Sequence, residues 1–172
     1  IVNRIGKDAP TIKDEQKFAA AFNAVQELIR QDLILAGHDV ASGGLITTLL
    51  EMCFADVDLS AQLDLSALGE EDIIKLLFSE NCGIVFQAKN ASVEDILEQK
   101  GIEFFKIGKV TKGGLLKIKN GEHDYKFDIP ELRNTWAKTS FLLDERQSGI
   151  DSATERYRNF ANQPLHFRFP ER

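Results

Sequence analysis

The segment that most constrains the fold is AGHDVASGG, residues 36–44, which lies between two apolar runs. The run DLIL before it is short and leucine-rich, which favours a strand, whereas LITTLLEMCFA after it is long enough for a deeply buried helix. A buried histidine or aspartate is costly unless it is paired. Either the fold or a ligand must therefore supply partners for His38 and Asp39.

The rest of the chain alternates between helical and strand patterns. An amino-terminal helix, capped by Thr11 or Asp14, carries large apolar residues at helical spacing, namely Phe18, Phe22, Val25 and Ile29. Further helices are predicted over GEEDIIKLLFSE, SVEDILEQKG and ELRNTWAKTSFLLDERQ, and further strands over LSAQLDL, CGIVFQAK, EFFKIGKV, GLLKIKN and HDYKFDI. Helices and strands interleave at first and the strands then bunch, so the predicted class is α+β, a layered α/β/α arrangement with a mixed sheet.

Length and composition bound the function classes. The 172 residues favour one domain with its own core, and the net charge of −6 without a dense Lys/Arg block argues against a nucleic-acid surface. No apolar run approaches the ~20 residues of a membrane span and no signal pattern appears at the amino terminus, so no membrane partner is expected. Cys53 and Cys82 lie in apolar stretches and are expected to be reduced core residues of a cytoplasmic protein.

The junction between the predicted strand and helix offers a site for a nucleotide and a metal. Free backbone N–H groups and the helix dipole at a glycine turn attract phosphate, which makes Ala41, Ser42, Gly43 and Gly44 candidate nucleotide contacts. A carboxylate at the strand end, Asp39, can hold Mg²⁺ that bridges to nucleotide phosphates. The alternative is that Asp39 caps the helix and its histidine neighbour hydrogen-bonds inside the fold.

Other candidates are weaker. A nucleophilic Ser42 activated by His38 would require a G-x-S-x-G turn, but Val40 occupies the first glycine position. Solvated turns or ordinary packing explain the remaining candidates, which are His123, Asp124, Arg133, Trp136 and His166. Neither the Walker A nor the dinucleotide fingerprint is present.

Four segments together resemble one enzyme family. LAGHDVASGGLITTLLEMCFA is similar to the HD-x-S-D-G-G-L segment in the second aminoimidazole-ribonucleotide-synthetase (AIR-synthetase) type carboxy-terminal domain of phosphoribosylformylglycinamidine synthases. IGKDAPTIKDEQKFAAAFNAVQELI, IIKLLFSENCGIVFQA and ELRNTWAKTSFLLDERQ have counterparts in the same order, so the resemblance covers nearly the whole chain. The LR-x-x-W-x-x-TS exit is typical of the large form of the synthase.

The resemblance implies a defined reaction. Such enzymes are ATP-dependent C–N ligases of purine biosynthesis: ATP activates the amide oxygen of formylglycinamide ribonucleotide, and ammonia from glutamine displaces the phosphate to give the amidine. The partners implied are ATP, Mg²⁺, the ribonucleotide, an ATP-binding half and a glutaminase domain of the same polypeptide. We expect the chain to be a piece of such a protein, with residues 1–147 as the AIR-synthetase-type domain and residues 148–172 as a helical or extended linker toward the glutaminase.

The family pattern assigns roles residue by residue. Asp39 matches the Mg²⁺-binding aspartate, and Ala41 stands where the family has a nucleotide-contacting serine. Ser42 stands where the family has an aspartate, so this chain reads A-S in place of S-D before Gly43 and Gly44. Two alternatives remain: a non-catalytic structural or interaction domain, or another superfamily member such as aminoimidazole ribonucleotide synthetase, selenophosphate synthetase or thiamine-phosphate kinase. Those members lack the LR-x-x-W exit.

Overall fold

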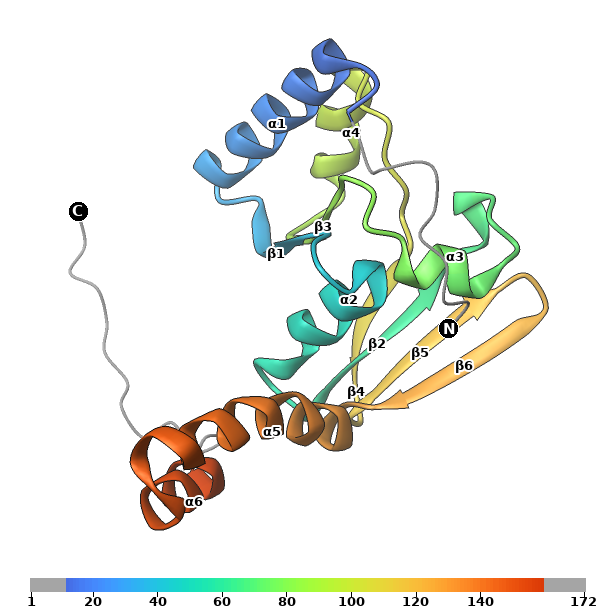
Figure 1. The fold of residues 1–172 in the computed structure, drawn as a ribbon. Coiled ribbons are helices and arrows are strands. Elements are labelled where there is room, and N and C mark those ends of the chain that lie inside the picture. Colours follow the sequence, from blue (N-terminus) through green and yellow to red (C-terminus); the bar gives the residue numbers. More distant parts are fainter. Residues whose placement is uncertain (1–11, 160–172) are drawn as a thin grey trace. The chain divides into compact units, whose positions relative to one another are not determined.

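The computed structural model describes residues 12–159, which divide into two compact units after Ile129 (Figure 1). The first unit contains, in chain order, α1 (Glu15–Arg30), β1 (Ile34–Asp39), α2 (Gly44–Phe54), β2 (Leu59–Asp64), the 3₁₀ helix η1 (Ser66–Leu68), α3 (Ile73–Phe78), β3 (Ile84–Ala88), α4 (Ser92–Gln99), β4 (Gly108–Lys112), β5 (Leu115–Asn120) and β6 (His123–Asp128). The second unit consists of α5 (Ile129–Ser148) from Pro130 onward and α6 (Ile150–Asn159).

The α+β class with a mixed sheet is confirmed, and the strands are divided between two sheets. β1 and β3 form an antiparallel pair, while the second sheet has the order β4-β2-β5-β6, in which only β2 and β5 run parallel. The layered arrangement expected from the sequence had one mixed sheet, whereas the structure has two sheets. The division follows from α2, whose side chains are apolar on nearly all sides and need neighbours in several directions: α2 contacts β1 in one sheet, β2 in the other, and α3.

The predicted amino-terminal helix is present, but the buried face differs from the predicted one. Phe18, Phe22 and Ile29 are 42%, 56% and 52% exposed, although their spacing suggested an inward face. Ala24 and Leu28 are buried instead, in a cluster with Val93 and Leu97 of α4. The cluster formed with α4 therefore decides the buried face of α1, rather than the size of its apolar residues.

Local capping follows the sequence. The Asp14 side chain accepts a hydrogen bond of 2.9 Å from the Lys17 N–H, so Asp14 is the cap of α1, while Thr11 lies outside the described residues. The predicted Asn120-Gly121 turn joins β5 to β6, and Asn120 also donates a 3.0 Å hydrogen bond to the Glu70 carbonyl. Local side-chain chemistry therefore places both features correctly.

The second unit is a helical hairpin. The Phe141 and Tyr157 rings pack with centroids 4.8 Å apart, and Arg156 Nε lies 2.6 Å from an Asp144 carboxylate oxygen. This guanidinium, followed by the Ser148 hydroxyl, lowers the pKa of Asp144. Of the helical or extended structure expected from residue 148 onward, residues 150–159 are helical, in α6.

The two cysteines differ from each other. Cys53 lies in α2 and is partly buried, and burial raises the pKa of its thiol. Cys82 is exposed, so its assignment to the core is wrong; it lies in the loop before β3, which begins only at Ile84. Among residues 12–159, no helix has the length and apolar character required to cross a membrane.

Candidate functional site

The strand–glycine–helix junction predicted from AGHDVASGG is present. β1 ends at Asp39, α2 begins at Gly44, and Gly43 occupies the N-cap position without a side-chain cap. Gly43 and Gly44 have φ values of 89° and 75°, a region that disfavours side chains with a Cβ. At Gly44 a Cβ would also lie 2.6 Å from the Phe78 carbonyl carbon, so only glycine permits α2 to start so close to α3.

His38 finds its partners within the fold. Its Nδ1 donates to the Asp39 carbonyl oxygen at 2.7 Å, and its Nε2 lies 3.0 Å from a Glu51 carboxylate oxygen on α2. The Thr48 hydroxyl, also on α2, donates to the same Asp39 carbonyl at 3.0 Å. The main chain at the end of β1 is thereby tied to α2 from two directions.

Asp39 itself points its carboxylate outward. Its side chain is 80% exposed, and one of its carboxylate oxygens lies 3.6 Å from His38 Nδ1. The predicted alternative, in which Asp39 caps the helix, is not what the structure shows, because Gly43 holds that position. An exposed carboxylate on a fixed backbone can bind a cation without first breaking an interaction in the core.

A metal at Asp39 would need ligands from outside the described part of the chain. Within residues 12–159, no group of three or more His, Cys, Asp or Glu side chains gathers to hold a metal ion. Mg²⁺ fits such a sparse site, because it keeps several water ligands and commonly binds through one or two carboxylates together with substrate phosphates. The donor chemistry of Asp39 therefore fits Mg²⁺ better than a metal that requires a closed protein cage.

Glu80 contributes a contact that sequence reasoning missed. Its carboxylate accepts a 3.0 Å hydrogen bond from the Gly43 N–H, across 37 residues of sequence. The Gly44 N–H donates to the Ala41 carbonyl at 2.9 Å. Both glycine N–H groups expected to face a phosphate are thus engaged, and a carboxylate already occupies the electropositive start of α2. Ala41 and Ser42 are exposed at the same turn.

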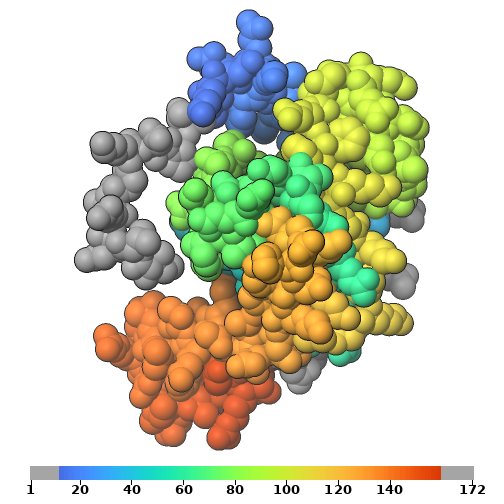
Figure 2. All heavy atoms as spheres, turned by 90° about the vertical axis from the view of Figure 1, so that its right-hand side faces the viewer, coloured from blue at the N-terminus to red at the C-terminus, as the bar shows by residue number. Residues whose placement is uncertain are grey.

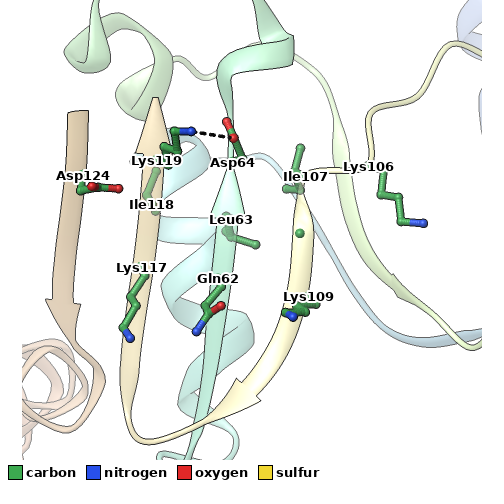
Figure 3. A pocket seen from close by; sticks show the side chains of 11 residues that line it. Gln62, Leu63, Asp64, Lys106, Ile107, Lys109, Lys117, Ile118, Lys119 and Asp124 are labelled. Carbon is green, nitrogen blue, oxygen red and sulfur yellow. Dashed lines mark ion pairs between the residues drawn. The ribbon is translucent and has the colours of Figure 1, made fainter. Parts of the chain in front are cut away.

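The remaining sequence candidates do not join this site. The ring nitrogens of His38 contact the Asp39 carbonyl and Glu51, and within residues 12–159 no hydrogen bond joins His38 to Ser42, so the structure gives the serine-nucleophile alternative no support. His123 and Asp124 form the exposed start of β6, Trp136 is 54% exposed on α5, and His166 lies outside the described residues. The hollow drawn in Figure 3 lies on the four-stranded sheet, and no residue of the 39–44 segment lines it.

Residues 3–119 match the family model described as "AIR synthase related protein, C-terminal domain". The chain belongs to this family. The resemblance deduced from the HD-x-x-x-G-G-L segment is therefore confirmed at the level of the domain. Solved structures share the fold: the "Structure of PurLQS from Thermotoga maritima" has a TM-score of 0.60 at 16% identity, covering 72% of this chain and 22% of that one. "T. maritima PurL complexed with FGAR" has a TM-score of 0.59 at 17% identity, over 74% and 23%.

The curated relatives are much longer proteins. A "Probable phosphoribosylformylglycinamidine synthase, chloroplastic/mitochondrial" of Arabidopsis thaliana is 33% identical over 151 residues, which is 86% of this AIRS_C chain and 11% of that protein. A "Probable phosphoribosylformylglycinamidine synthase" of Caenorhabditis elegans is 32% identical over 171 residues, 90% and 13% respectively. The human phosphoribosylformylglycinamidine synthase is 29% identical over 153 residues. The chain thus spans a small part of the length of each relative.

Proposed function

We propose that this chain is a domain of a phosphoribosylformylglycinamidine synthase, an ATP-dependent C–N ligase that takes its amide nitrogen from glutamine. The names of relatives that match 86% and 90% of the chain support this assignment. The observation that carries it within the structure is Asp39: the family's metal-binding position holds an exposed carboxylate at a strand end, on a backbone fixed by His38 and Thr48.

The proposed reaction converts formylglycinamide ribonucleotide to its amidine in purine biosynthesis. ATP transfers its terminal phosphoryl group to the amide oxygen, and ammonia released from glutamine attacks the activated carbon and expels phosphate. Residues 1–147 form the AIR-synthetase-type domain in this proposal, and residues 148–172 lead toward a glutaminase domain of the same polypeptide. We also propose a cytoplasmic location, whereas the name of the Arabidopsis relative gives that protein as chloroplastic/mitochondrial.

In the proposed site, Asp39 binds Mg²⁺ and the turn formed by Ala41, Ser42, Gly43 and Gly44 lies beside the nucleotide. The metal, when bound, neutralises charge on the nucleotide phosphates. Because the Glu80 carboxylate already accepts a hydrogen bond from the Gly43 N–H, direct backbone contacts with the nucleotide would come from the exposed residues Ala41 and Ser42. The Ala41 methyl group cannot replace a serine hydroxyl, so the metal carries more of the nucleotide's binding here than in relatives with serine.

The test is Asp39→Asn in the full-length enzyme, with Asp58→Asn as the matched control. Asp58 is exposed in the loop before β2 and has no side-chain role in the site. ATP-dependent amidine formation should fall on the order of 100-fold in Asp39→Asn, because a lost metal ligand removes several kcal/mol of charge stabilisation. Binding of Mn²⁺ as a spectroscopic substitute, followed by electron paramagnetic resonance, should weaken in the same variant only.

Near-normal activity together with unchanged Mn²⁺ binding in Asp39→Asn would reject the metal role. The non-catalytic interaction domain would then be the better assignment. One observation favours that second candidate: the two glycine N–H groups are satisfied inside the fold by Glu80 and Ala41, so the turn can be purely structural. A structural turn predicts that neither activity nor metal binding changes.

A further inference from the structure

One face of the four-stranded sheet carries a row of lysines. In the strand register Lys109 of β4 lies opposite Gln62 of β2, Gln62 lies opposite Lys117 of β5, and Lys117 lies opposite Lys126 of β6. Directly opposed residues point to the same side of a sheet, and neighbouring strands are ~4.8 Å apart. The three lysines, here called the lysine row, therefore cross the whole width of the sheet.

The lysine row lies on the face opposite the core. Ala61, Leu116 and Ile118, which alternate with the row residues along β2 and β5, are 8%, 0% and 1% exposed. Lys109 and Lys117 are exposed, and Figure 3 shows them on either side of Gln62 at one level of three adjacent strands. In Figure 2 the side chains of the β5–β6 hairpin, drawn in orange, reach the surface of the molecule.

The lysine row is not neutralised by the part of the chain that the structure describes. One level further along the sheet, Lys119 pairs with Asp64 at 3.7 Å. Lys106, which precedes β4, pairs with Glu94 of α4 at 2.7 Å. Within residues 12–159 no member of the lysine row forms an ion pair. Asp124 and Asp128 lie on the same face of β6, two residues to either side of Lys126, so the excess of positive charge on this face lies mainly at Lys109 and Lys117.

Protection of the sheet edges explains only part of this pattern. Lysine on an edge strand prevents edge-to-edge pairing, which accounts for Lys109 on β4 and Lys126 on β6. Lys117 lies on the inner strand β5 and is directly opposite Lys126, and like charges at such a position destabilise a sheet. An acidic partner on this face would turn that unfavourable pair into a favourable one.

The chemistry of the face limits the kind of partner. The shallow hollow beside the lysine row, about 550 Å³, has no aromatic side chain in its lining, so nucleic-acid bases would find no stacking surface. The backbone N–H groups of the inner strands are used in the sheet, which leaves only flexible lysine chains for an anion. A broad, charged and shallow surface suits another protein surface better than a small molecule.

We propose that the lysine row docks an acidic surface from another part of the same polypeptide. This rests on the proposed function in one respect, namely that the chain is part of a longer synthase. The curated relatives place 87–89% of their length outside the matched region, so most of the polypeptide is available as the partner. Charge complementarity would fix the orientation of the two surfaces rather than supply most of the binding energy.

The test uses a carbodiimide, which joins lysine amines to carboxylates without a spacer, on the full-length protein. The expected result is cross-links from Lys109, Lys117 and Lys126 to aspartates or glutamates outside these 172 residues. These cross-links should decrease several-fold in 1 M salt, where the screening length falls to about 3 Å. Cross-links found only between two isotopically distinct copies, or protection of the lysines by added pyrophosphate instead, would overturn the proposal.

Charge reversal separates this surface from general effects of charge. The variant Lys109→Glu/Lys117→Glu/Lys126→Glu should make the partner's carboxylates accessible to modification, detected by mass spectrometry. The control reverses three exposed lysines elsewhere and carries the same change in net charge: Lys13→Glu/Lys75→Glu/Lys138→Glu. Equal modification in both variants would reject the docking surface. Because the readout is accessibility and not amidine formation, failure of the proposed reaction would leave this result unaffected.

Discussion

Gly44 is the residue at which one added methyl group tests the packing of the candidate site most directly. A Cβ built there would lie 2.6 Å from the Phe78 carbonyl carbon and 2.8 Å from the Leu77 carbonyl oxygen. Both are backbone atoms of α3, so no side-chain rotation can relieve the clash. In Gly44→Ala the start of α2 and the end of α3 must therefore move apart.

The expected cost has two parts. A left-handed conformation costs an L-residue about 1–2 kcal/mol, and forcing extra atoms into a packed region typically adds about 1–3 kcal/mol. Gly69→Ala isolates the first part, because Gly69 has φ +74° against +75° at Gly44, and no atom lies within 4 Å of its built Cβ. We therefore expect Gly44→Ala to lower the free energy of unfolding by about 1–3 kcal/mol more than Gly69→Ala does.

The assay is urea denaturation followed by circular dichroism at 222 nm. The free energies of unfolding in water of the two variants are compared, with one common slope for their dependence on urea concentration. The functional consequence follows from geometry, since Glu80 comes shortly after α3 and holds the Gly43 N–H. Separation of α2 from α3 should release that contact. Equal losses of stability in the two variants would refute the close approach, since only backbone strain would then be measured.

The remaining predictions concern α1 and the hairpin of α5 and α6. Leu28→Ala should lower the free energy of unfolding by about 2–5 kcal/mol, because Leu28 is fully buried. Phe22→Ala should lower it by less than about 1 kcal/mol, because Phe22 is 56% exposed. A larger loss in Phe22→Ala, measured by urea denaturation, would contradict the observed buried face of α1. Since Arg156 lowers the pKa of Asp144, the carboxylate stabilises the hairpin above the unfolded pKa and this stabilisation is lost as pH falls through the folded pKa. Carbon-detected NMR titration should give a pKa for Asp144 below its usual range, and the Arg156→Gln substitution should raise that pKa. The same pKa in both proteins would disprove the coupling.

Much of the local structure followed from short-range patterns. The cap at Asp14, the turn at Asn120-Gly121 and the strand–glycine–helix junction at residues 39–44 each depend on side chains within a few residues of one another. Such features are readable because backbone geometry and the nearest side chains decide them. The family assignment was accessible for the same reason, since its motifs lie in continuous segments.

Contacts between distant segments were not readable in this way. Glu80 binds the Gly43 N–H across 37 residues of sequence, so no local pattern predicts this contact. The lysine row is a second case, because only the strand register shows that Lys109, Lys117 and Lys126 lie side by side.

The sequence by itself determined the elements, the glycine turn and the position of Asp39 at the end of a strand, whereas the exposure of its carboxylate is seen only in the structure. The tertiary structure decided which surfaces meet: it buried Leu28 instead of Phe22, and it gave His38 a partner in Glu51. The physical reason is that propensity acts on the chain locally, whereas burial depends on which apolar surfaces can cover one another once the helices and sheets have formed.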